Sequence, residues 1–284
     1  MKQFNSVSIV IPVYNEAAHL PACLDAIARQ TVKPKEVIVV DNNSNDETAT
    51  IAREYSFVRL LTEKKQGVVH ARDRGFNAAR GAIIGRIDAD TVISDNWVET
   101  LKTIFDDPTI DAVSGSAKYH DMSFSSLVNA IDLFIRSYLA RVLGNEVAMQ
   151  GANMAIRKTA WKNVRSLVCR ASGMHEDFDL TIHTSQHGHR VIFDKTLVAS
   201  IGARQLDSSF DAYTQYILLS PKTYGVHGLR SRRYMYPVCT LALIFYMPLR
   251  VLHRGYDKRR ERFSWMQLFA GVEQRVNPAT YVDY

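Results

Sequence analysis

The chain has 284 residues, of which 46% are hydrophobic and 23% charged, and its net charge is +6. These values are typical of a globular protein with a sizeable core, and they exclude a disordered tail or a collagen-like fibre. The three cysteines, Cys23, Cys169 and Cys239, lie far apart and form no CxxC pair. We therefore expect neither a disulfide framework nor a cysteine zinc site, and a reducing compartment fits best.

The first part of the chain alternates between strand and helix patterns. The apolar run at 7–13 is too short for a signal peptide and predicts a strand buried on both faces. Similar runs at 36–41, 57–61, 82–88 and 112–116 alternate with helical patterns at 20–30, 45–55, 69–79 and 96–105. Asn15 is expected to cap the first of these helices, and Ser44 with Glu47 the second. This alternation predicts an α/β domain with a mainly parallel sheet.

The second half is less regular. Its patterns predict helices at 124–143 and 175–188 and strands at 151–157, 190–194 and 197–201. The segment 235–249 is strongly apolar but contains Pro237 and Pro248, and it is shorter than the ~20 residues that a membrane-spanning helix needs.

Polar clusters follow three of the predicted strands. They are Tyr14-Asn15-Glu16, Asp41-Asn42-Asn43 and Asp88-Ala89-Asp90. In parallel α/β sheets, ligands bind beyond the carboxyl ends of the strands. We therefore expect these clusters to meet at one edge of the sheet and to form a binding site there.

Each candidate residue also has an ordinary structural interpretation. Asp88 and Asp90 are spaced to hold a divalent cation that bridges two phosphates, but turn formation explains them too, and a second Asp-x-Asp occurs at Asp177 and Asp179. Asp41 either accepts a hydrogen bond from a nucleobase or forms a turn.

The remaining candidates lie on predicted helices. Glu176 and Asp177 either supply a general base or simply favour a helix N-terminus. Arg72 either contacts a diphosphate or lies on a solvated helix face. The histidines show no HExxH-type spacing, so most are expected to be surface or core residues and not metal ligands.

Together, five segments resemble the inverting family 2 glycosyltransferases, which have a GT-A fold. They are VSIVIPVYNE (7–16), EVIVVDNNSNDET (36–48), GVVHARDRGFNAARGAIIGRIDAD (67–90), GANMAIR (151–157) and HEDFDL (175–180). The resemblance covers about residues 5–200. It implies a Rossmann-like, mainly parallel sheet with flanking helices in a domain over 1–205, with a nucleotide-binding half (1–116) and an acceptor half (117–205). A helical basic and apolar annex would follow at 206–284.

The resemblance also implies roles for individual residues and a reaction. A nucleotide-sugar donor would bind Pro12, Tyr14, Glu16, Asp41, Arg72 and Asp88, with Mn²⁺ or Mg²⁺ on Asp90 and Asp88. Asp177 would be the catalytic base, and Gly151, Ala152, Asn153 and Glu176 would shape the acceptor side. One hexosyl group would then pass to a hydroxyl by direct displacement with inversion, as in polysaccharide biosynthesis. No QxxRW motif is present, which favours a single transfer over processive synthesis, and Asp73 stands where the family often has Asn.

The C-terminal segment concentrates the positive charge. Between Arg230 and Arg262 there are nine Lys and Arg residues against two acids, which leaves the rest of the chain at about −1. Arginines precede the apolar segment 235–249, and Arg254, Lys258, Arg259, Arg260 and Arg262 follow it. This pattern favours contact with an anionic membrane over nucleic acid, and its alternative is a core helix with a solvated basic turn. We expect a cytoplasmic protein that is peripheral on the inner face of the cell membrane and acts on a glycan or lipid-linked acceptor.

Two other classes of function remain open on the residues alone. A nucleotidyltransferase normally has a glycine-rich loop after its first strand, and VYNEAAHL (13–20) contains no glycine. A non-catalytic nucleotide- or glycan-binding module of the same fold would have no need to keep Asp41, Asp88, Asp90 and Asp177 together. The nucleotide, the sugar and the acceptor do not follow from the sequence.

Overall fold

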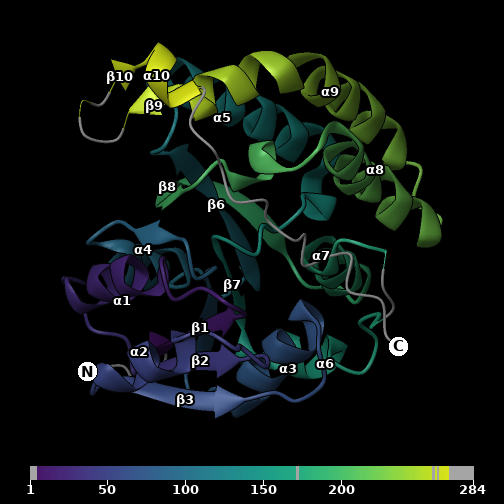
Figure 1. Cartoon of the computed structure of the whole chain (residues 1–284). Coiled ribbons are helices and arrows are strands. Elements are labelled where there is room, and N and C mark those ends of the chain that lie inside the picture. The colour runs from purple at the N-terminus through teal and green to yellow at the C-terminus, as the bar shows by residue number, and fades with distance from the viewer. Residues whose placement is uncertain (1–4, 171–172, 258–259, 261, 269–284) are drawn as a thin grey trace.

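The computed structural model describes residues 5–170, 173–257, 260 and 262–268. Lys258 and Arg259, two of the basic residues expected to contact lipid, lie outside these ranges. A central sheet is covered by helices on both faces, and the C-terminal helices form a further layer at the top of Figure 1.

An eight-stranded sheet forms the centre of the molecule. Its strands are β1 (Val7–Val13), β2 (Glu36–Asp41), β3 (Val58–Thr62), β4 (Ile83–Arg86), β5 (Val92–Ile93), β6 (Ala112–Tyr119), β7 (Met154–Arg157) and β8 (Val191–Ile201). They lie in the order β3-β2-β1-β4-β7-β6-β8-β5. Among these strands, only β7 and β5 pair antiparallel with their neighbours. The predicted mainly parallel α/β sheet is confirmed.

Helices cover the two faces of the sheet in two groups. The helices are α1 (Leu20–Ala28), α2 (Thr48–Glu54), α3 (Val68–Ala78), α4 (Trp97–Ile104), α5 (Ser125–Leu143), α6 (Lys158–Val164), α7 (Glu176–Gln186), α8 (Phe210–Val226), α9 (Arg232–Arg254) and α10 (Trp265–Leu268). Residues of α1, α2 and α4 share one core cluster, and residues of α3, α6 and α7 share another. In β1, Ile9 and Ile11 join the first cluster and Val10 the second, because alternate side chains of a strand point to opposite faces. This is the double-sided burial that the apolar run 7–13 predicts.

The structure has one long strand where the sequence predicts two. β8 runs through Lys195 and Thr196, and its register against β6 shifts between Gly115 and Ser116. Lys195 and Thr196 are exposed, so a bulged strand can contain these two polar residues. The hydroxyl of Thr196 donates a hydrogen bond to Asp194 over 2.6 Å, which gives this stretch the local appearance of a turn.

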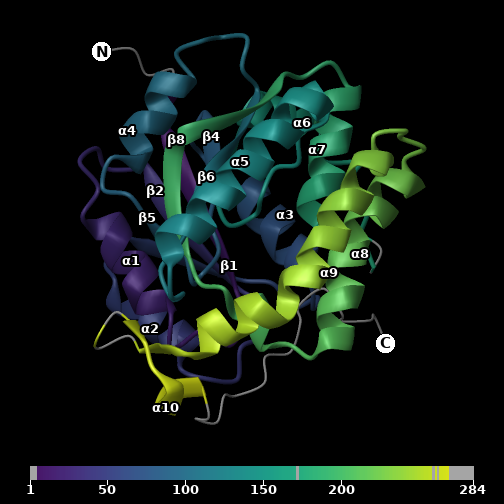
Figure 2. The ribbon, with the colours of Figure 1, turned by 90° about the horizontal axis from the view of Figure 1, so that it is seen from above.

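The C-terminal apolar segment forms one continuous helix. α9 runs for 23 residues through Pro237 and Pro248, both exposed, so the expectation of an element shorter than the ~20 residues of a spanning helix is wrong. α9 packs against α8, and α5 lies across the sheet on the same side of the molecule (Figure 2). The ring centroids of Tyr213 and Tyr246 lie 4.6 Å apart at the packing contact between α8 and α9. Burial of one side of α9 therefore offsets the free-energy cost of the backbone hydrogen bonds that its prolines remove.

A short hairpin and a one-turn helix complete the described chain. β9 (Tyr256–Asp257) and β10 (Arg262–Phe263) pair antiparallel, and α10 follows them. Two 3₁₀ turns, η2 (Gly144–Glu146) and η3 (Arg204–Asp207), connect larger elements. The turn η3 brings Arg204 to the carboxyl edge of the sheet.

Candidate active site

The loops after β1 and β2 are tied together by hydrogen bonds. The backbone N–H of Glu16 donates to the hydroxyl of Thr48 over 2.8 Å, and that of Asn15 donates to the hydroxyl of Ser44 over 3.0 Å. The side chain of Asn15 accepts from the N–H of Asn45 at 2.9 Å. Two of the three predicted polar clusters therefore meet at one edge of the sheet.

These contacts replace the helix caps that the sequence predicts. Asn15 has a left-handed backbone conformation with φ of 53° and reaches across to the β2 loop, so it does not cap α1, where His19 holds the cap position. The hydroxyl of Ser44 is likewise bonded to the β1 loop, and α2 begins after Glu47 with no side-chain cap. Both capping predictions are wrong because the polar side chains join neighbouring loops.

Asp41 ends β2 and lies mostly buried between the first and third strands. It pairs with Val13 on one side and Thr62 on the other, and its Oδ1 accepts a hydrogen bond from Ser44 N at 3.2 Å. The residue as a whole is 8% exposed at the edge of the sheet. Pro12 and Tyr14, the other predicted nucleoside contacts, lie at the end of the adjacent β1 and just beyond it.

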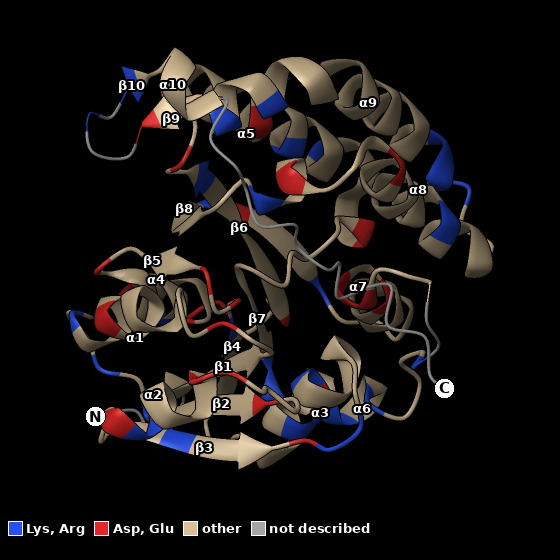
Figure 3. Cartoon of the chain, viewed as in Figure 1, with Lys and Arg blue, Asp and Glu red and all other residues tan. Residues whose placement is uncertain are grey.

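Three carboxylates, Glu16, Asp88 and Asp90, form what we call the acidic rim. Glu16 and Asp90 both accept hydrogen bonds from Arg204, at 2.9 and 2.8 Å. The nearby thiol of Cys23 has its pKa raised first by burial and then by all three carboxylates. The three acids therefore share one region of negative potential, and Figure 3 shows acidic segments on the loops beside β5, β4 and β1.

Asp88 is the most accessible of the rim carboxylates. Burial raises the pKa of Asp88 to about 6; Arg86 opposes this shift, while Asp90 adds to it. Solvent reaches 43% of the side chain and screens part of the effect. Asp88 thus presents oxygen ligands to the open side of the rim, where a cation would relieve the repulsion between the acids.

A buried network of two arginines lies behind the rim. Arg72 and Arg86 both pair with the carboxylate of Glu176, and Arg86 also reaches Asp88 over 3.2 Å. Arg72 is fully buried, and its other nitrogens contact Asp73 at 2.9 and 3.1 Å. Its guanidinium therefore lies neither on a solvated helix face nor at the open edge of the rim. Burial alone would raise the pKa of Glu176, but Arg86 and Arg72 hold it below its usual range.

Asp73 and Glu176 thus act within this network. Asp73 also pairs with Arg170 at 3.1 Å, so the acid that replaces the family's usual Asn holds two arginines together. Glu176 lies between Arg72 and Arg86 and has no role that requires it to gain or lose a proton at neutral pH.

Asp177 follows Glu176 in the first turn of α7 but has a different environment. Its Oδ2 accepts the N–H of Gly151 at 2.9 Å, and its Oδ1 accepts the N–H of Phe178 at 2.9 Å. Burial and then the charge of Glu176 raise the pKa of Asp177, against the opposing effects of His175 and Arg86. A fixed carboxylate with a raised pKa has the properties of a general base.

The loop that contains Gly151 contacts both Arg86 and Asp177. A Cβ at Gly151 would lie 2.5 Å from the guanidinium of Arg86, so only glycine permits this approach. Asn153 is fully buried; its amide nitrogen donates to Ser116 O and Leu197 O, each at 2.9 Å, and its oxygen accepts from Trp97. Asn153 is thus an internal cross-link of the predicted acceptor-side loop and does not face a ligand. Gly151 is buried against Arg86, and Ala152 is partly exposed.

Two residues of this site were missed by the sequence reasoning. Arg86 had a signal, because a charged residue interrupts an otherwise apolar strand two positions before Asp88. Arg204 had none, because it lies 114 positions beyond Asp90 and reaches it only through the fold.

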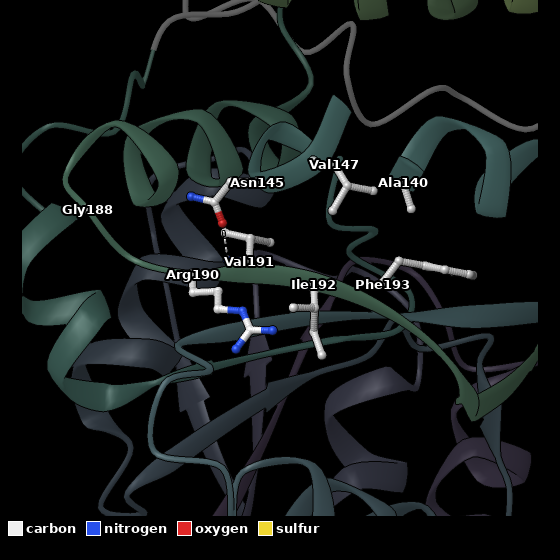
Figure 4. A pocket seen from close by; sticks show the side chains of 9 residues that line it. Ala140, Asn145, Val147, Gly188, Arg190, Val191, Ile192 and Phe193 are labelled. Atoms are coloured by element: carbon white, nitrogen blue, oxygen red, sulfur yellow. Dashed lines mark hydrogen bonds between the residues drawn. The ribbon is translucent and has the colours of Figure 1, made fainter. Parts of the chain in front are cut away.

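A separate pocket lies elsewhere on the domain. It has a volume of about 540 Å³ and is lined by Asn145, Val147, Arg190 and Phe193 among others, at the start of β8 (Figure 4). None of its lining residues belongs to the acidic rim or to the arginine network, so the candidate active site is defined by its chemistry and not by this pocket.

Comparison with known sequences identifies the family. The sequence model for glycosyl transferase family 2 matches residues 8–165, more than half of the chain. Glycosyltransferase AglE of Haloferax volcanii is 30% identical over 166 residues, covering 56% of this chain and 54% of that protein. Glycosyltransferase GlyG of Streptococcus pneumoniae is 32% identical over 122 residues, covering 41% of this chain and 40% of that protein. The chain thus spans about half the length of these relatives, or less.

Solved structures show the same fold. The mannosyltransferase PcManGT from Pyrobaculum calidifontis, in complex with GDP-Man and Mn²⁺, superposes with a TM-score of 0.63 at 20% identity over 87% of this chain and 73% of that one. S. aureus TarS 1–349 in complex with UDP gives 0.56 at 16% identity, over 75% and 65%. The predicted GT-A architecture is confirmed. The chain belongs to glycosyl transferase family 2.

Proposed function

We propose that this protein transfers one sugar from a nucleoside diphosphate sugar to an acceptor hydroxyl, with inversion at the anomeric carbon. The observation that carries the proposal is the pairing of two unlike carboxylate sites: the acidic rim, and Asp177 held near it through Arg86 and Gly151. The family and the fold support it, because the structural relatives bind GDP-Man and UDP.

Asp177 is the general base of the proposed reaction. It would take the proton of the acceptor hydroxyl, whose oxygen then attacks the anomeric carbon as the nucleoside diphosphate leaves from the opposite side. The N–H of Gly151 fixes the carboxylate, and the raised pKa of Asp177 improves its match to that task. Glu176 cannot replace it, because two arginines hold its charge.

The rim fits a hard divalent cation such as Mn²⁺ or Mg²⁺. Asp88 and Asp90 offer carboxylate oxygens, the ligands that such ions prefer. The pKa of Asp88 is raised mainly by burial and further by Asp90, and a cation between the two carboxylates would offset their repulsion. Arg204 already bridges Glu16 and Oδ2 of Asp90, so a cation that bound this oxygen would compete with the guanidinium. The bound ion would offset negative charge on the departing diphosphate.

The nucleoside would lie over β1 and β2. Asp41 ends β2 with 8% of the residue exposed at the edge of the sheet, and its carboxylate would accept a hydrogen bond from an imide or amine of the base. Pro12 and Tyr14 lie on the adjacent strand end. Uracil, thymine and guanine all carry such a donor, so the carboxylate alone does not choose among them.

Calorimetric titration tests this proposal directly. UDP, GDP and dTDP would each be titrated with and without Mn²⁺; we expect one of them to bind, and to bind more tightly with the metal. Asp90→Asn should abolish the effect of the metal. Asp95→Asn, an exposed acid five positions further on, should leave it intact. Equal binding of nucleotide by the wild type with and without Mn²⁺ would contradict the proposed metal role.

We further propose that the acceptor is lipid-linked and that α9 and α5 lie on an anionic membrane surface, the inner face of the cell membrane. Among the described helices, α9 has the length and composition to cross a membrane, yet only 17% of its apolar stretch is buried. Its inner side packs on the protein through Met235, Cys239 and Tyr246. A helix that is held on one side and apolar on the other suits the plane of a bilayer interface.

Exposed apolar side chains supply the surface for this contact. On α9 they are Tyr236, Leu241, Ile244, Phe245, Met247 and Val251, and on or beside α5 they are Phe124, Leu127, Ile131, Phe134 and Tyr138. Exposed arginines stand on both sides of the apolar segment 235–249: Arg230, Arg232 and Arg233 before it, and Arg260 and Arg262 after it. Arg254 instead lies 3.9 Å from Asp207.

Vesicle sedimentation tests this contact. The protein should bind vesicles that contain anionic lipid, and less so at high salt, because salt screens exposed charges. The double variant R232A/R233A should bind more weakly, while R29A/R53A, which removes two exposed charges elsewhere, should behave like the wild type. A wild-type protein that ignores anionic vesicles at low salt would overturn the membrane proposal.

A further inference from the structure

Four side chains from three segments converge beneath the C-terminal helices. They are Cys169, which follows α6, Asp179 and His183 on α7, and His227 at the C-terminal end of α8. One ligand atom from each lies within 4.8 Å of every other. We call this set the Cys-Asp-His-His cluster; it shares no residue with the acidic rim or the arginine network.

The distances within the cluster are close to those of a tetrahedral metal site. Ligands of a four-coordinate zinc ion lie roughly 3.3–3.6 Å apart, from Zn–S of about 2.3 Å and Zn–N or Zn–O of about 2.0–2.1 Å. Here Nε2 of His183 lies 3.5 Å from Oδ1 of Asp179 and 4.0 Å from Sγ of Cys169. Nε2 of His227 lies 2.8 Å from the same Oδ1, so one ring must withdraw by about 0.5 Å to admit an ion.

The donor types also match zinc. One thiolate and one carboxylate supply two negative charges, and two neutral imidazoles supply none, so a divalent ion makes the site neutral. That balance matters because the Asp179 side chain is only 1% exposed and the His227 side chain 9%. Sulfur and imidazole nitrogen select zinc over Mg²⁺ or Ca²⁺, which prefer oxygen.

Hydrogen bonding around the cluster differs from ligand to ligand: it links Asp179 to the backbone of Cys169, but it leaves Nδ1 of His183 without a partner in the described residues. The second oxygen of Asp179 accepts the backbone N–H of Cys169 at 2.8 Å, which fixes the carboxylate while Oδ1 faces the imidazoles. Nδ1 of His183 is buried and has no hydrogen-bond partner within the described residues. The proton that must remain on Nδ1 when Nε2 binds a metal would thus have no acceptor in the described part of the chain.

We propose that the Cys-Asp-His-His cluster binds one structural Zn²⁺. All four positions are filled by protein side chains, which is typical of a structural site and not of a catalytic one. On binding, the thiol of Cys169 loses its proton to solvent and the sulfur becomes a ligand. The ion would be independent of the Mn²⁺ or Mg²⁺ proposed for the rim.

The position of the cluster suggests what the ion does. Asp179 and His183 belong to the helix whose first turn carries Glu176 and Asp177, and His227 ends α8, which packs beside α9. Further links between these parts include the hydrogen bond from His175 N to Thr223, the ring contact of His175 with Tyr216 and the apolar cluster around Tyr224 and Met235. A zinc ion would therefore fasten the C-terminal helices to the helix that positions the base.

Metal analysis of the full-length, tag-free protein tests this inference. Protein from zinc-supplemented culture should retain about one zinc per chain after dialysis. Cys169→Ser and His227→Gln should each lose it. His187→Gln, an exposed histidine one turn from His183, and Cys239→Ser, a cysteine on α9, should both retain it. Asp90→Asn should also retain the zinc. This variant therefore distinguishes the zinc site from the rim, and it distinguishes a failure of the zinc inference from a failure of the proposed reaction.

Cobalt offers a measurement that does not depend on the folding of a variant. Wild-type protein stripped by a chelator and given Co²⁺ should show a thiolate-to-cobalt charge-transfer band, and amide exchange in α8 should slow when the metal returns. Folded wild-type protein that takes up neither Zn²⁺ nor Co²⁺ would overturn the inference and leave the cluster as a hydrogen-bonded network. Zinc that is kept by Cys169→Ser and His227→Gln but lost by Asp90→Asn would overturn it as well.

Discussion

The acidic rim and the arginine network are neighbouring regions in which the pKa values of carboxylates are shifted in opposite directions. At the rim, Glu16 and Asp90 share the single guanidinium of Arg204, and the pKa of Asp88 is raised to about 6. In the network, one carboxylate, Glu176, lies between two arginines and its pKa is lowered. The rim therefore has more negative than positive side chains, while the charge of Glu176 is balanced by two arginines. In the proposed reaction, the rim is the part of the site that binds the metal and the donor, and the network is the part that keeps its shape.

Asp177 lies close enough to Arg86 and Asp88 to shift the pKa of both, and its removal should have the largest effect on catalysis. Asp177→Asn keeps the side-chain shape but cannot accept the hydroxyl proton, so kcat should fall by about 10²- to 10⁴-fold. Nucleotide affinity, measured by calorimetry, should remain unchanged, because the rim is intact. Asp211→Asn, an exposed acid in the first turn of α8, is the matched control and should keep full activity. Full activity in Asp177→Asn would mean that another group is the base.

Glu176→Gln should have the largest effect on stability. The substitution leaves Arg72 and Arg86 buried with too little negative charge, and breaking a buried pair in this way costs about 3–5 kcal/mol. Asp95→Asn, which removes an exposed ion pair with Arg29, should change stability by less than about 1 kcal/mol. Urea denaturation of both variants measures the contrast. Similar losses in the two variants would show that the network does not differ from a surface pair.

The pH dependence of stability follows from the same carboxylate. The pKa of Glu176 is lower in the folded chain than its ordinary value of 4.5, so the charged form is the stabilised one. Its contribution is complete above pH 4.5 and is lost as the pH falls through the folded value. Glu176→Gln should therefore be less stable than the wild type at pH 7, and the two should converge in acid. Parallel stability curves from pH 7 to pH 3 would contradict this assignment.

The first half of the fold follows from local pattern, and the second does so only in part. Strand runs such as 7–13 and 37–40 are almost entirely apolar, so they predict buried strands in any context. The acids that follow strands 7–13 and 82–88, namely Glu16, Asp88 and Asp90, predict the rim. The packing of Arg72 against Glu176, or of Asn153 against Trp97, depends on residues 104 and 56 positions apart, and neither residue carries a local sign of its partner. Pro237 and Pro248 led to a wrong prediction of the length of α9 for a related reason. They lower local helix propensity, but tertiary packing outweighs that propensity.

The Cys-Asp-His-His cluster shows the same limit. Its only local signal is the spacing of Asp179 and His183, one turn apart on α7, which is common on helices without any metal. Cys169 and His227 stand 58 positions apart and approach only when α8 closes over α7. Counting cysteines for a CxxC spacing could not find a site with one cysteine.

Substitution of Arg204 has the smallest expected effect, but it discriminates best between a rim that is open to a cation and a rim that is preorganised like the network. Its guanidinium pairs with Glu16 and Asp90 at a place where the rim is partly open, and such pairs contribute up to about 1 kcal/mol. If this arginine occupies the rim in competition with a divalent cation, Arg204→Met should raise Mn²⁺ affinity by up to about fivefold, because both carboxylates become available. Arg190→Met, an exposed arginine paired with Asp107, should leave the affinity unchanged. Weaker Mn²⁺ binding in Arg204→Met would mean that the arginine fixes the carboxylates in the geometry that the ion needs, and the rim would then be preorganised like the network behind it.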